Sequence, residues 1–343
     1  MSLKNEAAIV NELGTAIVSD AKKLKAPMNI MEICGTHTMD ICRYGLRSML
    51  PGNISLISGP GCPVCVTPIE EVDRAIEISR QKDVITATFG DMMRVPGTRS
   101  TLNSEKSKGA DIRVLYSPED GLELARKNPD KRVVFIGVGF ETTSPAIALT
   151  VMSAKKEGLK NFLVLPAFKT VIPPMEALLS DKELKINGFI APGHVSAVIG
   201  AKPYEYITGK YKVPCVITGF EAGDIMQGIH MLIKQRLNSE GRVEIQYKRI
   251  VRYEGNKVAA DAMKEVFAAV DSNWRGIGVI PKSGLTFGPG YEGFNALNAF
   301  NPDVSYSKEP KGCRCGEVLK GMIKPPKCPL FAKKCTPFSW RQV

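Results

Sequence analysis

The sequence lacks the segments that would carry a protein into or through a membrane. Residues 1–30 show no cationic start, apolar run and small-residue cleavage site, which together form a signal peptide. No run of about 18 uninterrupted apolar residues is present, whereas a membrane-spanning helix needs about 20. We therefore predict a cytoplasmic protein without membrane contact, in which thiols stay reduced and structural disulfides are rare.

Acidic residues are too few to balance the basic ones. The chain has 46 Lys and Arg against 35 Asp and Glu, a formal net charge of +11. Residues 308–343 hold nine basic and two acidic residues, so this tail carries +7 of that charge. A basic tail is typical of nucleic-acid binding, but no helix-turn-helix or RRM pattern accompanies it. We favour lysines that compensate a cysteine-rich site, and predict no nucleic-acid partner.

The cysteines fall into three groups that indicate chemistry. Four lie in the tail, at Cys313, Cys315, Cys328 and Cys335. Their spacing suits zinc and an iron–sulfur cluster equally well. A two-residue-spaced pair, Cys62 and Cys65, is typical of a redox dithiol, and Cys34 lies three residues before His37. The two remaining cysteines, Cys42 and Cys215, are predicted to be packing residues.

Short apolar runs recur at near-constant intervals and predict an α/β fold. Each is followed by a turn residue and mostly by a helix-compatible segment, as in buried parallel strands. The predicted strands are Met28–Cys34, Ile54–Ser58, Val84–Phe89, Ile112–Tyr116, Arg132–Val138, Phe162–Pro166, Gly188–Ala191 and Val213–Thr218.

The intervals between strand ends are similar in the two halves of this region, which indicates a duplicated unit. With 343 residues, of which 44% are apolar, the chain is long enough for two or three cored domains. We predict two related α/β domains, each with a four-stranded parallel sheet, and a third α/irregular domain that carries the cysteine tail. The predicted boundaries are an N-terminal helix in 1–27 that packs on the third domain, domain I in 28–120, domain II in 121–222 and the third domain in 223–343.

The candidate site lies at the carboxyl ends of the strands, where open parallel sheets bind ligands. Cys34 ends the first predicted strand and the Cys62–Cys65 pair follows the second, so we expect them in one crevice. His37 and Asp91 should lie at the same edge. Two further strand-end residues, Glu141 and His194, face a shared crevice or serve only as caps.

Six sequence motifs follow one another along the chain. They are Met31-Glu-Ile-Cys-Gly-Thr-His-Thr38, Ser58-Gly-Pro-Gly-Cys-Pro-Val-Cys-Val-Thr-Pro68, Thr88-Phe-Gly-Asp-Met-Met-Arg-Val-Pro-Gly97, Gly139-Phe-Glu-Thr-Thr143, Pro192-Gly-His-Val-Ser196 and the four tail cysteines. In this order the motifs resemble the hydrogenase maturation factor HypD family. The match spans Glu32 to Cys335, and no motif position departs from the family pattern.

The resemblance implies an assembly scaffold with redox capability rather than a turnover enzyme. Such proteins, with a small HypC-type partner, assemble the Fe(CN)2CO group of NiFe-hydrogenases, and a HypE-type partner delivers cyanide. By position, a 4Fe-4S cluster would be held by Cys313, Cys315, Cys328 and Cys335. Cys34 would anchor the transient Fe(CN)2CO iron, with His37 beside it, and the Cys62–Cys65 pair would be the redox dithiol.

Two other classes of protein stay open on residue chemistry. A free-standing iron–sulfur thiol-disulfide oxidoreductase would use the same cluster and dithiol. A zinc-stabilised nucleic-acid-binding protein would use the basic tail, and its binding would depend steeply on salt.

Overall fold

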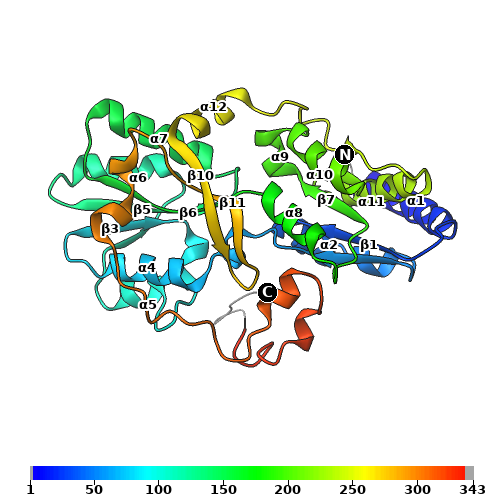
Figure 1. Cartoon of the computed structure of the whole chain (residues 1–343), viewed down its shortest axis with the longest axis horizontal. Coiled ribbons are helices and arrows are strands. Elements are labelled where there is room, and N and C mark those ends of the chain that lie inside the picture. Colours follow the sequence, from blue (N-terminus) through cyan, green and yellow to red (C-terminus); the bar gives the residue numbers. More distant parts are fainter. Residues whose placement is uncertain (1–2, 337–343) are drawn as a thin grey trace. The chain divides into compact units, whose positions relative to one another are not determined.

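The strands form two separate sheets, and each sheet is the centre of a compact unit (Figure 1). The computed structural model describes residues 3–336, with side chains from Glu6 onward. Unit 1 combines the described residues up to 62 with 171–257 and 318–322, and unit 2 combines 63–170, 258–317 and the described residues from 323. The α/β class predicted from the sequence is confirmed.

Unit 1 is built on a five-stranded parallel sheet. Its strands, in spatial order, are β2 (Ile54–Ser58), β1 (Met28–Glu32), β7 (Gly188–Pro192), β8 (Cys215–Thr218) and β9 (Val243–Ile245). The central strands are apolar on both faces, as expected for a parallel sheet that helices cover. The helices are α1 (Leu3–Ala21), α2 (Gly35–Arg43), α8 (Ile172–Ser180), α9 (Gly193–Ile199), α10 (Glu205–Tyr211) and α11 (Ala222–Leu237), with short 3-10 turns at Leu46–Met49 and Lys202–Tyr204.

The amphipathic pattern of the N-terminal segment forms α1, which packs along α11 (Figure 1). Ile17 and Ala21 of α1 are fully buried in one core cluster with Ile225 and Ile229 of α11 and residues of β1. Burial of an isoleucine side chain contributes about 1.5–3 kcal/mol, so this apolar stripe supplies much of the stability of α1.

Unit 2 is built on a six-stranded mixed sheet in the order β10 (Phe267–Trp274), β11 (Gly278–Phe287), β6 (Phe162–Lys169), β5 (Arg132–Gly139), β3 (Val84–Thr88) and β4 (Ile112–Val114). The last four are parallel, while β11 runs antiparallel to β6 and forms a long hairpin with β10 (Figure 1). The helices are α3 (Pro63–Val66), α4 (Ile69–Ser79), α5 (Leu102–Ser107), α6 (Pro118–Lys127), α7 (Ser144–Glu157), α12 (Lys257–Val266), α13 (Ala296–Phe300) and α14 (Cys315–Leu319), with 3-10 turns at Gly90–Arg94, Glu292–Phe294 and Pro325–Lys327.

The eight strands predicted from the sequence all exist, but their predicted division between sheets was wrong. The first two and last two join with β9 in unit 1, and the four between them form the parallel part of the unit 2 sheet. The chain leaves unit 1 after Cys62 and returns at Val171, so both units are discontinuous in sequence. The residue pattern of a strand indicates that the strand is buried, but it does not indicate which strands lie beside it. A crossover between parallel strands can lead to either side of a sheet, or to another sheet.

The predicted boundaries at 27/28, 120/121 and 222/223 accordingly differ from the compact units. The C-terminal third also holds more strand than its sequence indicated. The third domain was predicted to be α/irregular, whereas α12 ends at Val266 and the β10–β11 hairpin follows. Pairing of β11 with β6 supplies hydrogen bonds that override these weak local signals.

Candidate functional site

Cys34 occupies the N-cap position of α2, directly after β1. Its sulfur accepts hydrogen bonds from the backbone N–H groups of Thr36 and His37 and from the Thr36 hydroxyl, the donors that a helix N-terminus leaves unpaired. Burial outweighs these donors and raises the pKa of Cys34 to about 11. Cys34 is therefore a protonated thiol at neutral pH, already surrounded by groups that would stabilise a bound thiolate.

The loop after β2 packs directly on Cys34. The Gly35 N–H donates to the Gly61 carbonyl at 2.9 Å. A methyl group on Gly61 would lie 2.0 Å from the Cys34 nitrogen, so only glycine fits there. A methyl group on Gly35 would lie 3.2 Å from Cβ of Cys62. The structure therefore brings Cys34 and Cys62 together at the carboxyl edge of the unit 1 sheet.

Glu32, which the sequence analysis did not single out, is a buried carboxyl beside Cys34. The carboxyl accepts from the Cys34 N–H at 3.3 Å and from the Thr38 hydroxyl at 2.6 Å. Burial raises the pKa of Glu32 to about 7, despite hydrogen bonds from Thr38 and Ser58 that lower it. An acidic residue inside the apolar run Met28–Cys34 was the available signal, since charged side chains are seldom fully buried without a role.

His37 is held as a neutral ring with one defined tautomer. Its Nε2 lies 2.9 Å from the Gly219 carbonyl, which can only accept, so Nε2 carries the proton. Burial lowers the pKa of His37 to about 4. Nδ1 therefore carries the lone pair of the neutral ring. This nitrogen is buried and has no hydrogen-bond partner among the described residues. A fixed backbone acceptor on the other nitrogen is the usual arrangement behind a metal-binding histidine.

Phe220 lies between the two histidines that the sequence predicted. Its ring stacks on His37 at a centroid distance of 4.7 Å and on His194 at 3.9 Å. His194 itself is exposed, in the first turn of α9. The structure thus joins His37 and His194 through an aromatic residue that lies two residues beyond β8 and that carried no sequence signal of its own.

The remaining strand-end residues belong to unit 2. Cys65 is half-buried on α3, Asp91 is exposed in the 3-10 turn after β3, and Glu141 is buried just after β5. Asp91 was predicted to lie at the same sheet edge as Cys34 and His37, but it follows β3 of the unit 2 sheet, whereas Cys34 follows β1 of the unit 1 sheet, so this prediction was wrong. A crevice shared by these residues with Cys34 stays a prediction.

Unit 2 also buries a cation that sequence analysis missed. Lys169, the last residue of β6, has no exposed surface on its side chain. Its ammonium donates to Glu71 at 3.1 Å and to the Ser272 hydroxyl at 2.6 Å. Burial raises the pKa of Glu71, and the charge of Lys169 opposes that rise. The pair joins α4, which follows the dithiol segment, to the sheet.

The four tail cysteines are half-buried and lie in unit 2. The sulfurs of Cys313 and Cys315 are 3.1 Å apart, and the hydrogen bond between them lowers the pKa of Cys313. Cys328 and Cys335 bracket a loop closed by the Cys335 N–H, which donates to the Leu330 carbonyl at 2.9 Å. Cys42, by contrast, is exposed and accepts from Arg47, so its predicted packing role was wrong, whereas Cys215 is buried in β8 as predicted.

The donor chemistry of this tail fits an iron–sulfur cluster, although the full set is not assembled. Four thiols with cationic neighbours are the ligands that such a cluster uses. In residues 3–336 no group of three or more His, Cys, Asp or Glu side chains stands close enough to hold a metal ion. The structure thus brings two of the four sulfurs together, and convergence of all four remains a prediction.

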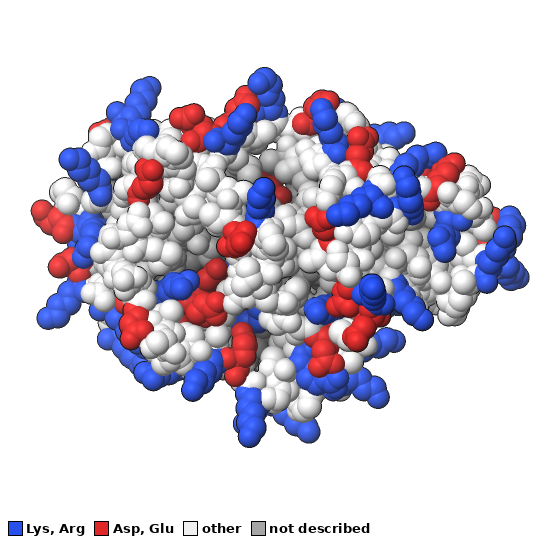
Figure 2. All heavy atoms as spheres, in the orientation of Figure 1, with Lys and Arg blue, Asp and Glu red and all other residues white. Residues whose placement is uncertain are grey.

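Charges are mixed over the visible surface. Figure 2 shows Lys and Arg interspersed with Asp and Glu on the face that it presents, without a continuous basic stripe. Nucleic-acid binding proteins gather positive charge on one face or along one helix.

Among helices in the described part of the chain, none is both long and apolar enough for a membrane crossing.

Comparison with known proteins gives consistent results over nearly the whole chain. The family model HypD, described as "Hydrogenase formation hypA family", matches residues 8–339. The chain is 45% identical to hydrogenase maturation factor HypD of Escherichia coli strain K12, covering 91% of this chain and 84% of that protein. The same identity, 45%, is found with hydrogenase maturation factor HypD of Rhodobacter capsulatus, covering 97% and 89%. Identity with the factor of that name from Cupriavidus necator is 42%, covering 90% and 84%.

Proposed function

The chain belongs to the HypD family of hydrogenase maturation factors, and from this premise we propose that it is the scaffold on which the Fe(CN)2CO group of NiFe-hydrogenases is assembled. The family supports a role in hydrogenase maturation. The finer proposal is that a HypC-type protein shares the iron with this chain and that a HypE-type protein delivers its cyanide ligands. The protein acts as a scaffold that is loaded and unloaded rather than as a turnover enzyme.

The observation that carries the proposal is the setting of Cys34. A low-spin iron that bears cyanide and carbon monoxide is a soft centre, for which thiolate is the suitable protein ligand. The donors from Thr36 and His37 converge on the Cys34 sulfur and favour its ionised form. Because the pKa of the unliganded thiol is about 11, iron binding at neutral pH displaces its proton. The neutral His37 adds no positive charge that would repel the metal.

We further propose that the tail cysteines and the Cys62–Cys65 dithiol form two redox sites that exchange electrons. Cys313, Cys315, Cys328 and Cys335 would hold a 4Fe-4S cluster, which when bound supplies electrons one at a time. Reduction of a Cys62–Cys65 disulfide takes up two electrons and two protons, and yields two thiols. A one-electron reductant would have to act twice for each disulfide reduced.

The scaffold role is tested by infrared absorption in the cyanide and carbon monoxide stretching region. The protein is co-purified anaerobically with its HypC-type partner, as wild type, Cys34→Ala and Cys42→Ala. Cys42 is the matched control, because it lies on the same helix but is exposed at its far end. We expect the bands to vanish in Cys34→Ala and to persist in Cys42→Ala. Unchanged bands in Cys34→Ala would mean that the iron is anchored elsewhere.

Metal analysis of the same samples separates the other two protein classes. Iron with acid-labile sulfide and without zinc is expected. Stoichiometric zinc would favour the zinc-stabilised nucleic-acid-binding protein. A cluster together with disulfide reductase activity in the absence of a partner would favour the free-standing oxidoreductase.

A further inference from the structure

The turn between β10 and β11 contacts the helix that carries Cys65. The backbone N–H of Arg275, the first residue of this turn, donates to the Val66 carbonyl at 2.8 Å. Val66 follows Cys65 and ends α3. Because Trp274, the preceding residue, is fully buried and its indole N–H donates to Ser283 at 2.7 Å, the turn is held firmly. The hairpin tip is therefore hydrogen-bonded to the end of the dithiol segment.

The same turn also packs on the tail. A methyl group on Gly276 would lie 2.5 Å from the Gly316 Cα, and one on Gly316 would lie 2.0 Å from the Gly276 oxygen. The two backbones thus meet without room for a side chain at either position. Gly316 directly follows Cys315, so this contact sets where the Cys313–Cys315 pair lies in unit 2.

The side chain of Arg275 is a buried cation next to these thiols. It is 3% exposed, and its Nε donates to Glu309 at 3.2 Å. The next residue, Gly276, packs on Gly316, which adjoins Cys315, so Arg275 lies beside this pair of cysteines. Its positive charge favours the ionised form of both thiols. A buried charge is stable only when opposite charge compensates it, and Glu309 supplies opposite charge to Arg275. Thiolates that bind a cluster would carry negative charge of their own.

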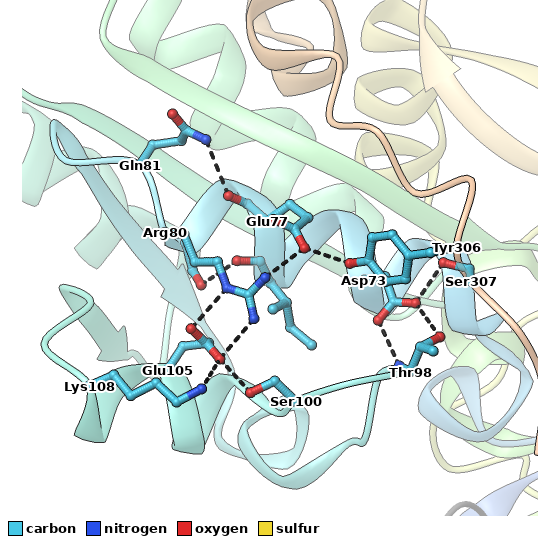
Figure 3. A network of polar contacts seen from close by, with 12 residues as sticks. Asp73, Glu77, Arg80, Gln81, Thr98, Ser100, Glu105, Lys108, Tyr306 and Ser307 are labelled. Atoms are coloured by element: carbon cyan, nitrogen blue, oxygen red, sulfur yellow. Dashed lines mark hydrogen bonds and ion pairs between the residues drawn. The ribbon is translucent and has the colours of Figure 1, made fainter.

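The segment leading to the tail cysteines is clamped onto α4, the helix that follows the dithiol. The Tyr306 hydroxyl donates to Glu77 at 2.5 Å and the Ser307 hydroxyl donates to Asp73 at 2.6 Å. Figure 3 shows both hydrogen bonds. Asp73 also accepts from the backbone N–H and hydroxyl of Thr98. These hydrogen bonds order a stretch of sequence with little periodicity. The turn between β10 and β11 contacts both the segment of the Cys62–Cys65 pair and the segment of the tail cysteines.

We propose that Arg275 is a positioning residue that joins the dithiol segment to the cluster-binding tail and that its buried guanidinium sets the reduction potential of the cluster. The inference rests on the cluster of the proposed function. Reduction makes a cluster more negative by one charge, so a fixed cation beside it stabilises the reduced form and raises the potential. Removing that cation makes the cluster harder to reduce.

The test compares the full-length chain, reconstituted anaerobically with iron and sulfide, as wild type, Arg275→Gln, Arg275→Lys and Arg113→Gln. Arg113 is the matched control, because it is an arginine of unit 2 in an exposed ion pair with Asp111 on an edge strand. Iron and sulfide per chain give the cluster content, and a redox titration followed by electron paramagnetic resonance gives the potential.

We expect Arg275→Gln to lower the reduced-to-oxidised ratio at least tenfold at the wild-type midpoint, about 59 mV for a one-electron couple. Arg275→Lys should stay close to wild type in potential because it keeps the charge, and Arg113→Gln should match wild type. Loss of the cluster in Arg275→Gln but not in Arg275→Lys would also support a requirement for the charge.

Two results would overturn the inference in distinguishable ways. Equal potentials in wild type and Arg275→Gln, or the same shift in both Arg275 variants, would refute the role of the charge while leaving the cluster in place. A wild-type chain that takes up no iron and sulfide would overturn the proposed cluster, and the inference with it.

Discussion

Burial of the Glu32 carboxyl should make the stability of unit 1 depend on pH. The side chain has no exposed surface, and burial raises its pKa from 4.5 to about 7. Because the pKa in the folded state is the higher one, the folded protein keeps this proton over a range where the unfolded chain has released it. The contribution of Glu32 to stability is therefore greatest below pH 4.5, falls as the pH rises towards 7, and is then constant.

The magnitude follows from the size of the shift. A rise of about 2.5 units corresponds to about 3 kcal/mol at about 1.4 kcal/mol per unit. Part of this loss has already occurred at pH 5, so about 2–3 kcal/mol should be lost between pH 5 and pH 8. Glu32→Gln has nearly the same shape and keeps an oxygen that can accept from Thr38, but it never ionises. The variant should therefore gain about 2–3 kcal/mol relative to wild type on going from pH 5 to pH 8.

Urea unfolding at both pH values measures this difference directly. Glu12→Gln, an exposed glutamate on α1, is the control and should show no such change between the two conditions. Taking the difference between variant and wild type cancels all other titrating groups. If the stability difference between Glu32→Gln and wild type is the same at pH 5 and pH 8, Glu32 titrates normally and the burial argument is refuted.

Two further substitutions test the packing described above. Gly61→Ala should lower the free energy of unfolding in urea by about 3 kcal/mol, because the new methyl group would lie 2.0 Å from the Cys34 nitrogen. Gly52→Ala is the control and should change stability little, because a methyl group there would have nothing within 4 Å. Similar losses in both variants would show that the loop moves freely. Lys169→Met should lower the free energy of unfolding by about 3–5 kcal/mol, because it leaves Glu71 buried without its cation. Adding Glu71→Leu should recover most of this loss. A double variant no more stable than Lys169→Met would show that loss of the ion pair does not cause the destabilisation.

Much of the local structure could be predicted from periodicity. All eight predicted strands were found, because a run such as Phe162–Pro166 carries its burial pattern in its own residues. The β10–β11 hairpin could not be predicted in the same way, since it depends on hydrogen bonds to β6, more than a hundred residues earlier. Local propensity between Val266 and Gly293 was too weak to indicate it.

Some residues of the candidate site could likewise be predicted from the sequence, and others could not. Cys34, His37 and the Cys62–Cys65 pair could be singled out as candidates from residue type and spacing, because thiols and imidazoles carry reactive groups wherever they lie. Phe220 and Arg275 were not found. An aromatic ring or an arginine is common in any sequence, and its role here depends on what other segments place beside it.

The sequence by itself determined the eight strands, the candidate cysteines and, through its motifs, the family. Only the tertiary structure decided that β7 lies beside β1 and that the chain enters unit 2 after Cys62 and returns at Val171. It also decided that Glu32 loses all contact with water and that one hairpin turn touches both Val66 and Gly316. Local pattern depends on interactions between residues a few positions apart, whereas these features arise from packing between segments that are distant in sequence.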